Sequence, residues 1–575
     1  MEHVSVDKAV IAILLVAGLF VSTPNVHASL IGSSLFNQSD EDIQTQNIHD
    51  IQPLKRSLDL LNAGKIHEAI EAARSYLIDF PKSAPAYEVL GAAQALNQEL
   101  DSALKNLKKA IKLDPNQSTA YIKIGDIYYA QNEITKAKHY FLESVKINPN
   151  DRLVHQRLGK VYDIENQVEL AIKHYELGIL GTPPNYIGVK VDLAHRYNQL
   201  QQYDKTVSIL QDVVLPSVQD AAAHMTLGAA YFGLAKTDKA ISEFKIAHRV
   251  DPNDARVLVT LGVAYRENKS ISLALDSLQK AIDLAPGMAK AYFQLGQTYA
   301  ASNKLENALT SYQKAAELSP TMQYLDVLAS TYQSTNQQEL AEKTYLSSVK
   351  QHSKEAFPYY KLGLFYGAQL DYQKALKQFK KANKINKNDP QVIKALSLAY
   401  QRLGDLENAI KHAQRLVKLN ENHPGNQLYL ATIYDDAAKY KQAEHHYRKV
   451  LKLDAKQPIA LNNLAMILAR KKQYSEAQKL AHEAHGLVPQ NGIIADTLGW
   501  VLYQAGNPQE SLKYLRKAAD LLDNYPDVHY HLGVVYAARG DKASAKASLE
   551  KSLGMSASFS GAHEAKSLLS ELDNN

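Results

Sequence analysis

Histidine pairs at short spacing are the first residues of this chain whose types could support chemistry. His482 and His485 lie on either side of Glu483, in a segment with the composition of a helix. A zinc-binding helix needs its two histidines four residues apart, so that both ring nitrogens face one ion. Here they are three apart, and the adjacent His445 and His446 diverge on a helix. We interpret both pairs as solvated surface residues and expect no metal site.

The sequence contains none of the motifs that build a nucleophile or a phosphate cradle. There is no Cys among the 575 residues, which excludes disulfides, thiolate metal sites and Cys nucleophiles. No Walker-type loop, Gly-x-Ser-x-Gly elbow or dinucleotide fingerprint is present. We therefore expect a protein that is not an enzyme, with no catalytic residue, cofactor or small-molecule substrate.

Aromatic side chains are the remaining candidates, and their chemistry is recognition. Tyr occurs 34 times and Trp once. An excess of one amphipathic aromatic residue indicates a recurring position, and Leu-Gly pairs followed by Tyr do recur, as at Leu227-Gly228…Tyr231 and Leu532-Gly533…Tyr536. The small residue of this motif is found at positions 91, 125, 159, 194, 228, 262, 296, 329, 363, 397, 431, 465, 499 and 533. Successive positions are 34 residues apart, except for one step of 35 and one of 33.

Each recurring residue has a mechanical role in a pair of helices. Apolar residues fall at helical spacing within a unit, as Ala240, Phe244 and Ala247 do in a second helix. The small residue of the first helix and an Ala twelve positions later allow the two backbones to approach closely. Pro closes many units because it cannot continue a helix. One pair cannot bury its apolar face alone, but stacked pairs can.

This period and these residues resemble the tetratricopeptide repeat (TPR) across about residues 50–557. The resemblance implies an all-α fold, an α-solenoid that winds as a right-handed superhelix of about fifteen helix pairs. We expect Ala562–Asp573 to form a capping helix. The predicted organisation is a signal peptide at 1–28, a polar linker at 29–49, units 1–4 at 50–186, units 5–8 at 187–321, units 9–15 at 322–557, and the cap with its tail at 558–575. Bends are expected near 181–187 and 320–322, where the step departs from 34.

The N-terminus predicts export. Ala9–Val21 is a 13-residue apolar run, too short for a spanning helix but suited to a signal peptide. Val26-His27-Ala28 supplies small residues before a cleavage site after Ala28. We expect a periplasmic or secreted protein, with an uncleaved N-terminal anchor as the alternative.

In the resembled family a concave groove is lined by the first helix of each unit. Positions three before and one after the small residue lie off the core stripe and face that groove. Many of them are apolar or aromatic, which favours protein or peptide partners held by side-chain pockets. The predicted partner-binding residues at these positions are Phe293, Tyr360, Leu364, Met466, Trp500 and Tyr530, and Tyr503 is added because it lies beside Trp500. A carboxylate clamp is not supported, because Met466 stands four residues after Asn462 where the clamp needs Asn.

The last units carry a narrower resemblance. The segments Ala495–Tyr503, Tyr525-Pro526 and His529–Gly533 are similar to bacterial envelope TPR proteins. Those include proteins of exosortase (PEP-CTERM) and exopolysaccharide loci, and lipoproteins that dock proteases. A lipid anchor cannot be carried over, since there is no Cys.

We therefore predict a non-catalytic interaction scaffold of the bacterial cell envelope, in envelope assembly or exopolysaccharide export. Peripheral association with a membrane stays open. A docking adaptor for an envelope protease and a helical-repeat RNA-binding protein are the alternatives. The net charge is only +5, with no run of five or more Lys and Arg. Nucleic-acid readers concentrate positive charge, so we expect no nucleic-acid partner.

Overall fold

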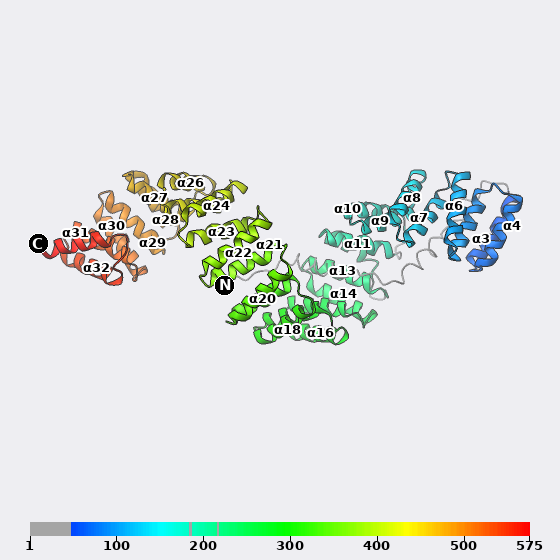
Figure 1. Ribbon diagram of the computed structural model, residues 1–575, viewed down its shortest axis with the longest axis horizontal. Coiled ribbons are helices and arrows are strands. Elements are labelled where there is room, and N and C mark those ends of the chain that lie inside the picture. The colour runs from blue at the N-terminus through cyan, green and yellow to red at the C-terminus, as the bar shows by residue number, and fades with distance from the viewer. Residues whose placement is uncertain (1–47, 183–186, 216–217, 575) are drawn as a thin grey trace. The chain divides into compact units, whose positions relative to one another are not determined.

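The structure, a computed structural model, describes residues 48–182, 187–215 and 218–574. Within these ranges every regular element is a helix, 31 in all, numbered α3 to α33 (Figure 1). Consecutive helices pack as fifteen pairs, followed by one final helix. This confirms the predicted all-α solenoid with a C-terminal capping helix. The predicted signal peptide at 1–28, and the linker up to residue 47, lie outside the described residues.

The helix bounds follow the 34-residue period. The first helices of the pairs are α3 (Ile48–Asn62), α5 (Ala84–Leu96), α7 (Ser118–Ala130), α9 (Arg152–Ile164), α11 (Gly188–Gln199), α13 (Ala221–Gly233), α15 (Ala255–Glu267), α17 (Ala289–Ala301), α19 (Met322–Ser334), α21 (Ala356–Ala368), α23 (Pro390–Arg402), α25 (Pro424–Asp436), α27 (Pro458–Arg470), α29 (Gly492–Gln504) and α31 (Pro526–Ala538). The second helices are α4 (Ile66–Asp79), α6 (Leu100–Leu113), α8 (Ile134–Ile147), α10 (Val168–Gly178), α12 (Tyr203–Leu210), α14 (Thr237–Val250), α16 (Ile271–Leu284), α18 (Leu305–Leu318), α20 (Gln338–Gln351), α22 (Tyr372–Ile385), α24 (Leu406–Leu419), α26 (Tyr440–Leu453), α28 (Tyr474–Leu487), α30 (Pro508–Leu521) and α32 (Lys542–Met555). The final helix is α33 (Ala562–Asn574).

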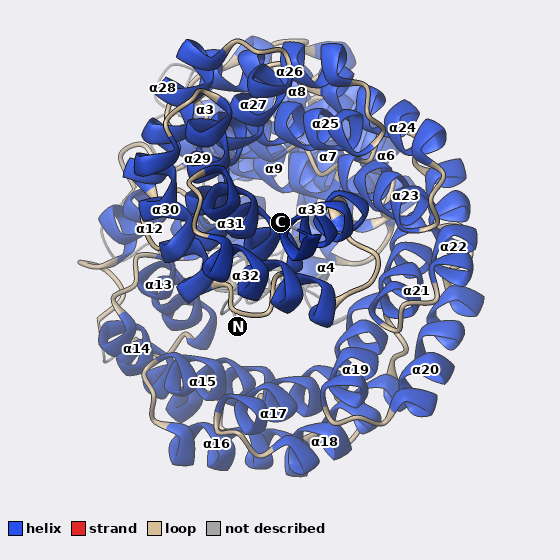
Figure 2. Cartoon of the chain, turned by 90° about the vertical axis from the view of Figure 1, so that its left-hand side faces the viewer, coloured by secondary structure: helices blue, strands red, loops and turns tan. Residues whose placement is uncertain are grey.

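The chain divides into two compact units, Met1–Ser319 and Pro320–Asn575. The division lies between α18 and α19. Within the second unit, Figure 2 shows α19, α21 and α23 along one side of the ribbon and α20, α22 and α24 along the other. The predicted subdivision at 186 and 321 and the predicted bends stay predictions, and residues 183–186 lie outside the described ranges.

Close approach of the two helices in a pair depends on the small residue of the first helix. A Cβ added at Gly228 would lie 2.5 Å from the Phe244 ring, and one at Gly262 would lie 2.5 Å from Leu278. Where the small residue is Ser397, its hydroxyl donates to the carbonyl of Ala409 at 2.7 Å. Thr206, which replaces the usual Ala of a second helix, likewise donates to the carbonyl of Ala194, at 2.9 Å. These hydroxyl bonds satisfy backbone carbonyls that face the helix contact.

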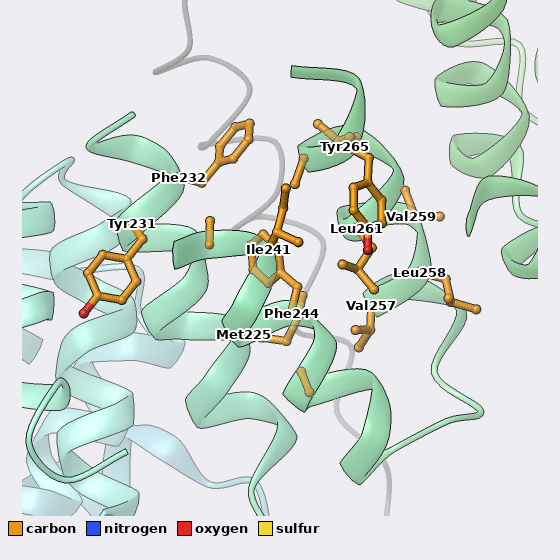
Figure 3. Close-up of a cluster of buried hydrophobic side chains, with 14 of the residues drawn as sticks. Met225, Tyr231, Phe232, Ile241, Phe244, Val257, Leu258, Val259, Leu261 and Tyr265 are labelled. Carbon is orange, nitrogen blue, oxygen red and sulfur yellow. The ribbon is translucent and has the colours of Figure 1, made fainter. Parts of the chain in front are cut away.

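The core continues from unit to unit rather than closing within one. In the cluster of Figure 3, Phe244 of α14 lies among Met225 of α13 and Val257 and Leu261 of α15. Burial of each such side chain contributes roughly 1.5–3 kcal/mol. Met225 and Val259 occupy the position three before the small residue, and both are buried there. That position is therefore interior in this part of the first compact unit.

A left-handed residue turns each first helix into its second helix. Seven positions after each small residue the backbone has a positive φ, from +54° at Ala438 to +87° at Gly506. Most of these residues are not Gly, and several are Asn, which tolerates this conformation well. None of the described helices is both long and apolar enough to span a membrane.

Candidate partner-binding surface

Phe293, the predicted groove residue of the first compact unit, lies in the core. It is on α17, its side chain is only 3% exposed, and its ring centroid is 5.6 Å from that of Tyr312. Such burial leaves the ring almost no surface for a partner. The reason is local packing, since the Phe293 ring lies against Tyr312 of α18, the second helix of the same pair.

Two predicted residues lie on α21 at different depths. Leu364 is 41% exposed, whereas Tyr360 is half-buried, with its ring centroid 6.1 Å from that of Phe379. Burial raises the pKa of the Tyr360 hydroxyl, and Asp389 raises it further. At neutral pH the hydroxyl is therefore an uncharged donor. Leu364 and Tyr360 therefore offer a partner apolar surface with one hydroxyl group.

Met466 of α27 is half-buried and packs against the cluster that contains Leu464 and Ile467. The neighbouring asparagines serve the fold, since Asn463 Nδ2 donates to the Tyr447 hydroxyl at 2.9 Å and Asn462 is buried. Neither asparagine is therefore placed to bind the carboxylate of a partner.

The structure brings three of the predicted residues together near the C-terminus. Trp500 and Tyr503 lie on α29, with ring centroids 5.4 Å apart, and Tyr530 of α31 is 6.1 Å from Trp500. Phe559, in the segment between α32 and α33, lies 5.8 Å from Tyr530. All four rings are half-buried. We call Trp500, Tyr503, Tyr530 and Phe559 the C-terminal aromatic cluster.

A polar pair orients the Trp500 ring. His531 stacks on it with centroids 4.0 Å apart and planes 20° from parallel. The carboxylate of Asp496 lies 2.9 Å from His531 Nδ1. A carboxylate only accepts hydrogen bonds, so the His531 Nδ1–H donates to Asp496. Trp500 is therefore held between its own helix and the next unit.

Sequence reasoning did not single out His531 or Phe559. Phe559 lies beyond the last repeat, so no periodicity marks it. His531 follows a pattern that the sequence contains. An acidic residue three positions before the small residue of one unit pairs with a basic residue 35 positions later, in the next unit. The same spacing joins Glu88 to Lys123 at 2.5 Å and Asp326 to Lys361 at 3.0 Å. The pair of Asp496 and His531 makes the same contact between units, with the aromatic His in place of Lys.

Close packing fixes Tyr530 as well. A Cβ at Gly561 would collide with the Tyr530 ring. The chain just before α33 can therefore pass this close to Tyr530 only with Gly at this position. Burial raises the pKa of the Tyr530 hydroxyl, and Glu564 and Tyr503 raise it further. The cluster thus presents neutral aromatic surface with hydroxyl donors, which suits binding rather than proton transfer.

Of the two histidine pairs predicted to be solvated, His482 and His445 are exposed, whereas His485 and His446 are half-buried against tyrosine rings. His482 lies 3.8 Å from Glu510, and the His485 ring meets the Tyr514 ring edge-on with centroids 5.2 Å apart. His446 stacks on Tyr434, and His445 is exposed. Among the residues that the structure describes, no group of His, Asp and Glu could hold a metal ion.

Models described as tetratricopeptide repeat or TPR repeat match eight segments of the chain. The matched residues are 91–132, 118–151, 225–289, 289–322, 358–389, 395–423, 457–524 and 497–558. No curated protein matches the sequence.

Two solved structures illustrate what the chain is similar to. The APC/C hetero-tetramer Cut9-Hcn1 matches with 15% identity, 85% of this chain and 96% of that chain covered, and a TM-score of 0.39. Naa15/Naa10 bound to HypK-THB matches with 11% identity, coverage of 92% and 97%, and a TM-score of 0.36.

Proposed function

Because the chain belongs to the tetratricopeptide repeat superfamily, we propose that it is a non-catalytic scaffold that binds protein or peptide partners along the first helices of its units. The C-terminal aromatic cluster carries this proposal. It joins rings from α29, α31 and the segment between α32 and α33 into one half-buried surface.

The cluster has the properties of a binding hot spot. Trp and Tyr dominate such sites because they supply large contact area with few rotatable bonds. The rings of Trp500 and Tyr530 are already held by His531 and by the approach at Gly561. A prearranged surface reduces the ordering cost of binding on its own side. The matching partner is a segment that inserts a large apolar or aromatic side chain.

Trp500 makes the proposal directly measurable. It is the only Trp in the chain, so its fluorescence reports on this cluster alone. Partners recovered from an envelope extract with the full chain are titrated into purified protein, with calorimetry as the second readout. We expect a change in Trp500 emission on binding.

Variants separate this site from others. Replacing both anchors, Trp500→Ala/Tyr530→Ala, should weaken the partner by about 30-fold or more, as hot-spot residues do. Tyr525→Ala is the matched control, because Tyr525 is exposed and lies in the same segment outside the cluster. Unchanged affinity in the double variant, with circular dichroism showing it folded, would remove the cluster from the proposal.

We further propose an envelope location, with a role in envelope assembly or exopolysaccharide export, or in docking an envelope protease. The apolar run Ala9–Val21 and the small residues up to Ala28 support export. The mass of the purified native protein checks this, since cleavage leaves Ser29 as the first residue. An intact N-terminus in a cytoplasmic fraction would contradict it.

A further inference from the structure

Positive charge is concentrated in one stretch of the second compact unit. Between Tyr372 and Lys456 the sequence has seventeen Lys and Arg against eight Asp and Glu, an excess of nine positive charges. The whole chain carries only +5, so its other residues together are acidic. The net charge of the entire chain therefore does not reveal this basic region.

The second helices of three consecutive units present this charge. Lys377, Lys381 and Lys384 fall at i, i+4 and i+7 on α22, opposite the buried Leu376, Phe379 and Ala382. The neighbouring second helices add Lys411 and Lys418 on α24 and Lys452 on α26. All six are exposed. We call these six lysines the basic face. Figure 2 shows α22 and α24 on the side of the ribbon away from α21 and α23.

The lysines of the basic face are not neutralised by ion pairs in the part of the chain that the structure describes. None of the six lysines forms an ion pair within the described residues of the chain, whereas Glu444 and Glu476 nearby are already paired with Arg448. Lys384, Lys418 and Lys452 lie in the last turns of their helices, where a cation stabilises the helix. Lys377 and Lys411 lie in the middle turns, so the helix dipole does not account for them.

We propose that the basic face binds the surface of an anionic phospholipid membrane. Clusters of four to eight lysines on a helical surface are attracted to acidic headgroups. Beside three of the lysines stands an exposed apolar residue, at Ile385, Leu419 and Leu453. Apolar side chains next to lysines suit the boundary between headgroups and acyl chains. This surface is separate from the aromatic cluster on α29 and α31.

Nucleic acid fits the same surface less well. Its readers rely on the arginine fork and on aromatic rings that stack with bases. Here Arg415 donates to Asn383 at 3.0 Å, and Arg448 is held by Glu444 and Glu476. The Tyr400 and Tyr434 rings are each covered by a stacked His ring, with centroids 5.6 Å and 5.5 Å apart. The exposed groups are lysines and apolar side chains, and one lysine, Lys381, lies 5.4 Å from the Tyr359 ring centroid.

Vesicle flotation with the full chain tests the proposal. One set of vesicles is phosphatidylcholine, and the other contains about one third phosphatidylglycerol. We expect binding only to the anionic set and a steep loss with salt, because exposed charges are screened. Failure to bind anionic vesicles at low salt would overturn the proposal.

Charge-reversal variants locate the contact. Lys377→Glu/Lys384→Glu/Lys411→Glu should weaken vesicle binding by at least about 100-fold, since the loss of each Lys alone costs about fivefold and the new Glu adds repulsion. The matched control is Lys105→Glu/Lys112→Glu/Lys173→Glu, which changes the net charge equally at exposed second-helix positions of the first compact unit. Equal loss in both variants would show a general charge effect and overturn the assignment. Tighter binding to a mixed-sequence RNA than to the vesicles, abolished by the first variant alone, would replace the membrane with nucleic acid.

Discussion

At the residue scale, the left-handed turn residue of each unit is a small, recurring source of strain. Leu370 has a φ of +63°, and its side chain is 72% exposed. Residues with a Cβ other than Asn and Asp lose roughly 1–2 kcal/mol in this conformation, and Gly does not. Leu370→Gly should therefore stabilise the α21–α22 pair by about 0.5–1 kcal/mol, after the greater chain entropy of unfolded Gly is subtracted.

Hydrogen exchange at the amides of α21 and α22 measures this local change. Asn336→Gly is the control, because Asn336 has a φ of +60° and is also exposed. Asn tolerates the left-handed region, so its replacement should gain much less. Faster exchange in Leu370→Gly would show that the Leu370 side chain contributes packing which its exposure hides.

The same scale shows how far the site could be predicted. Trp500 and Tyr530 were predicted from the register that the 34-residue period assigns, and Tyr503 was predicted because it lies beside Trp500. Phe293 shares the register of Tyr360, yet Phe293 is buried and Tyr360 is only half-buried. Register alone cannot give burial, because burial depends on the side chains packed against each position, such as Tyr312 against Phe293.

At the scale of elements, the fold was almost fully predictable. Repetition assigns each helix many times over, and Pro, the small residue and the Ala mark the same points in unit after unit. The structure adds the reason that one position is small. In α21, a Cβ at Gly363 would lie 2.6 Å from Phe379 Cδ1, whereas one at Gly367 would meet open space.

These two glycines give a matched pair of substitutions within one helix. Gly363→Ala should destabilise the α21–α22 pair by about 1–3 kcal/mol, because the Phe379 ring must move in a packed contact. Gly367→Ala should be neutral or stabilise by up to about 1 kcal/mol, through helix propensity. Amide exchange and thermal unfolding measure both. Equal effects of the two changes would mean that helix propensity, not the approach of α22, governs this position.

At the scale of the whole molecule, stability is a sum of contacts between neighbouring units. Such a chain has no single core whose loss unfolds every part. The division between Ser319 and Pro320 falls between two complete helix pairs, α17–α18 and α19–α20. No described pair is split by it.

Cutting the chain at this point should therefore give two folded pieces. We expect the far-ultraviolet circular dichroism spectra of residues 48–319 and 320–575, added together, to reproduce that of residues 48–575. The C-terminal piece should also bind the partner of the full chain with the same change in Trp500 emission, because every residue of the aromatic cluster lies in it. A folded C-terminal piece that no longer binds would place part of the recognition surface in the first compact unit. An unfolded piece would show that stability is shared across the division, against the nearest-neighbour account.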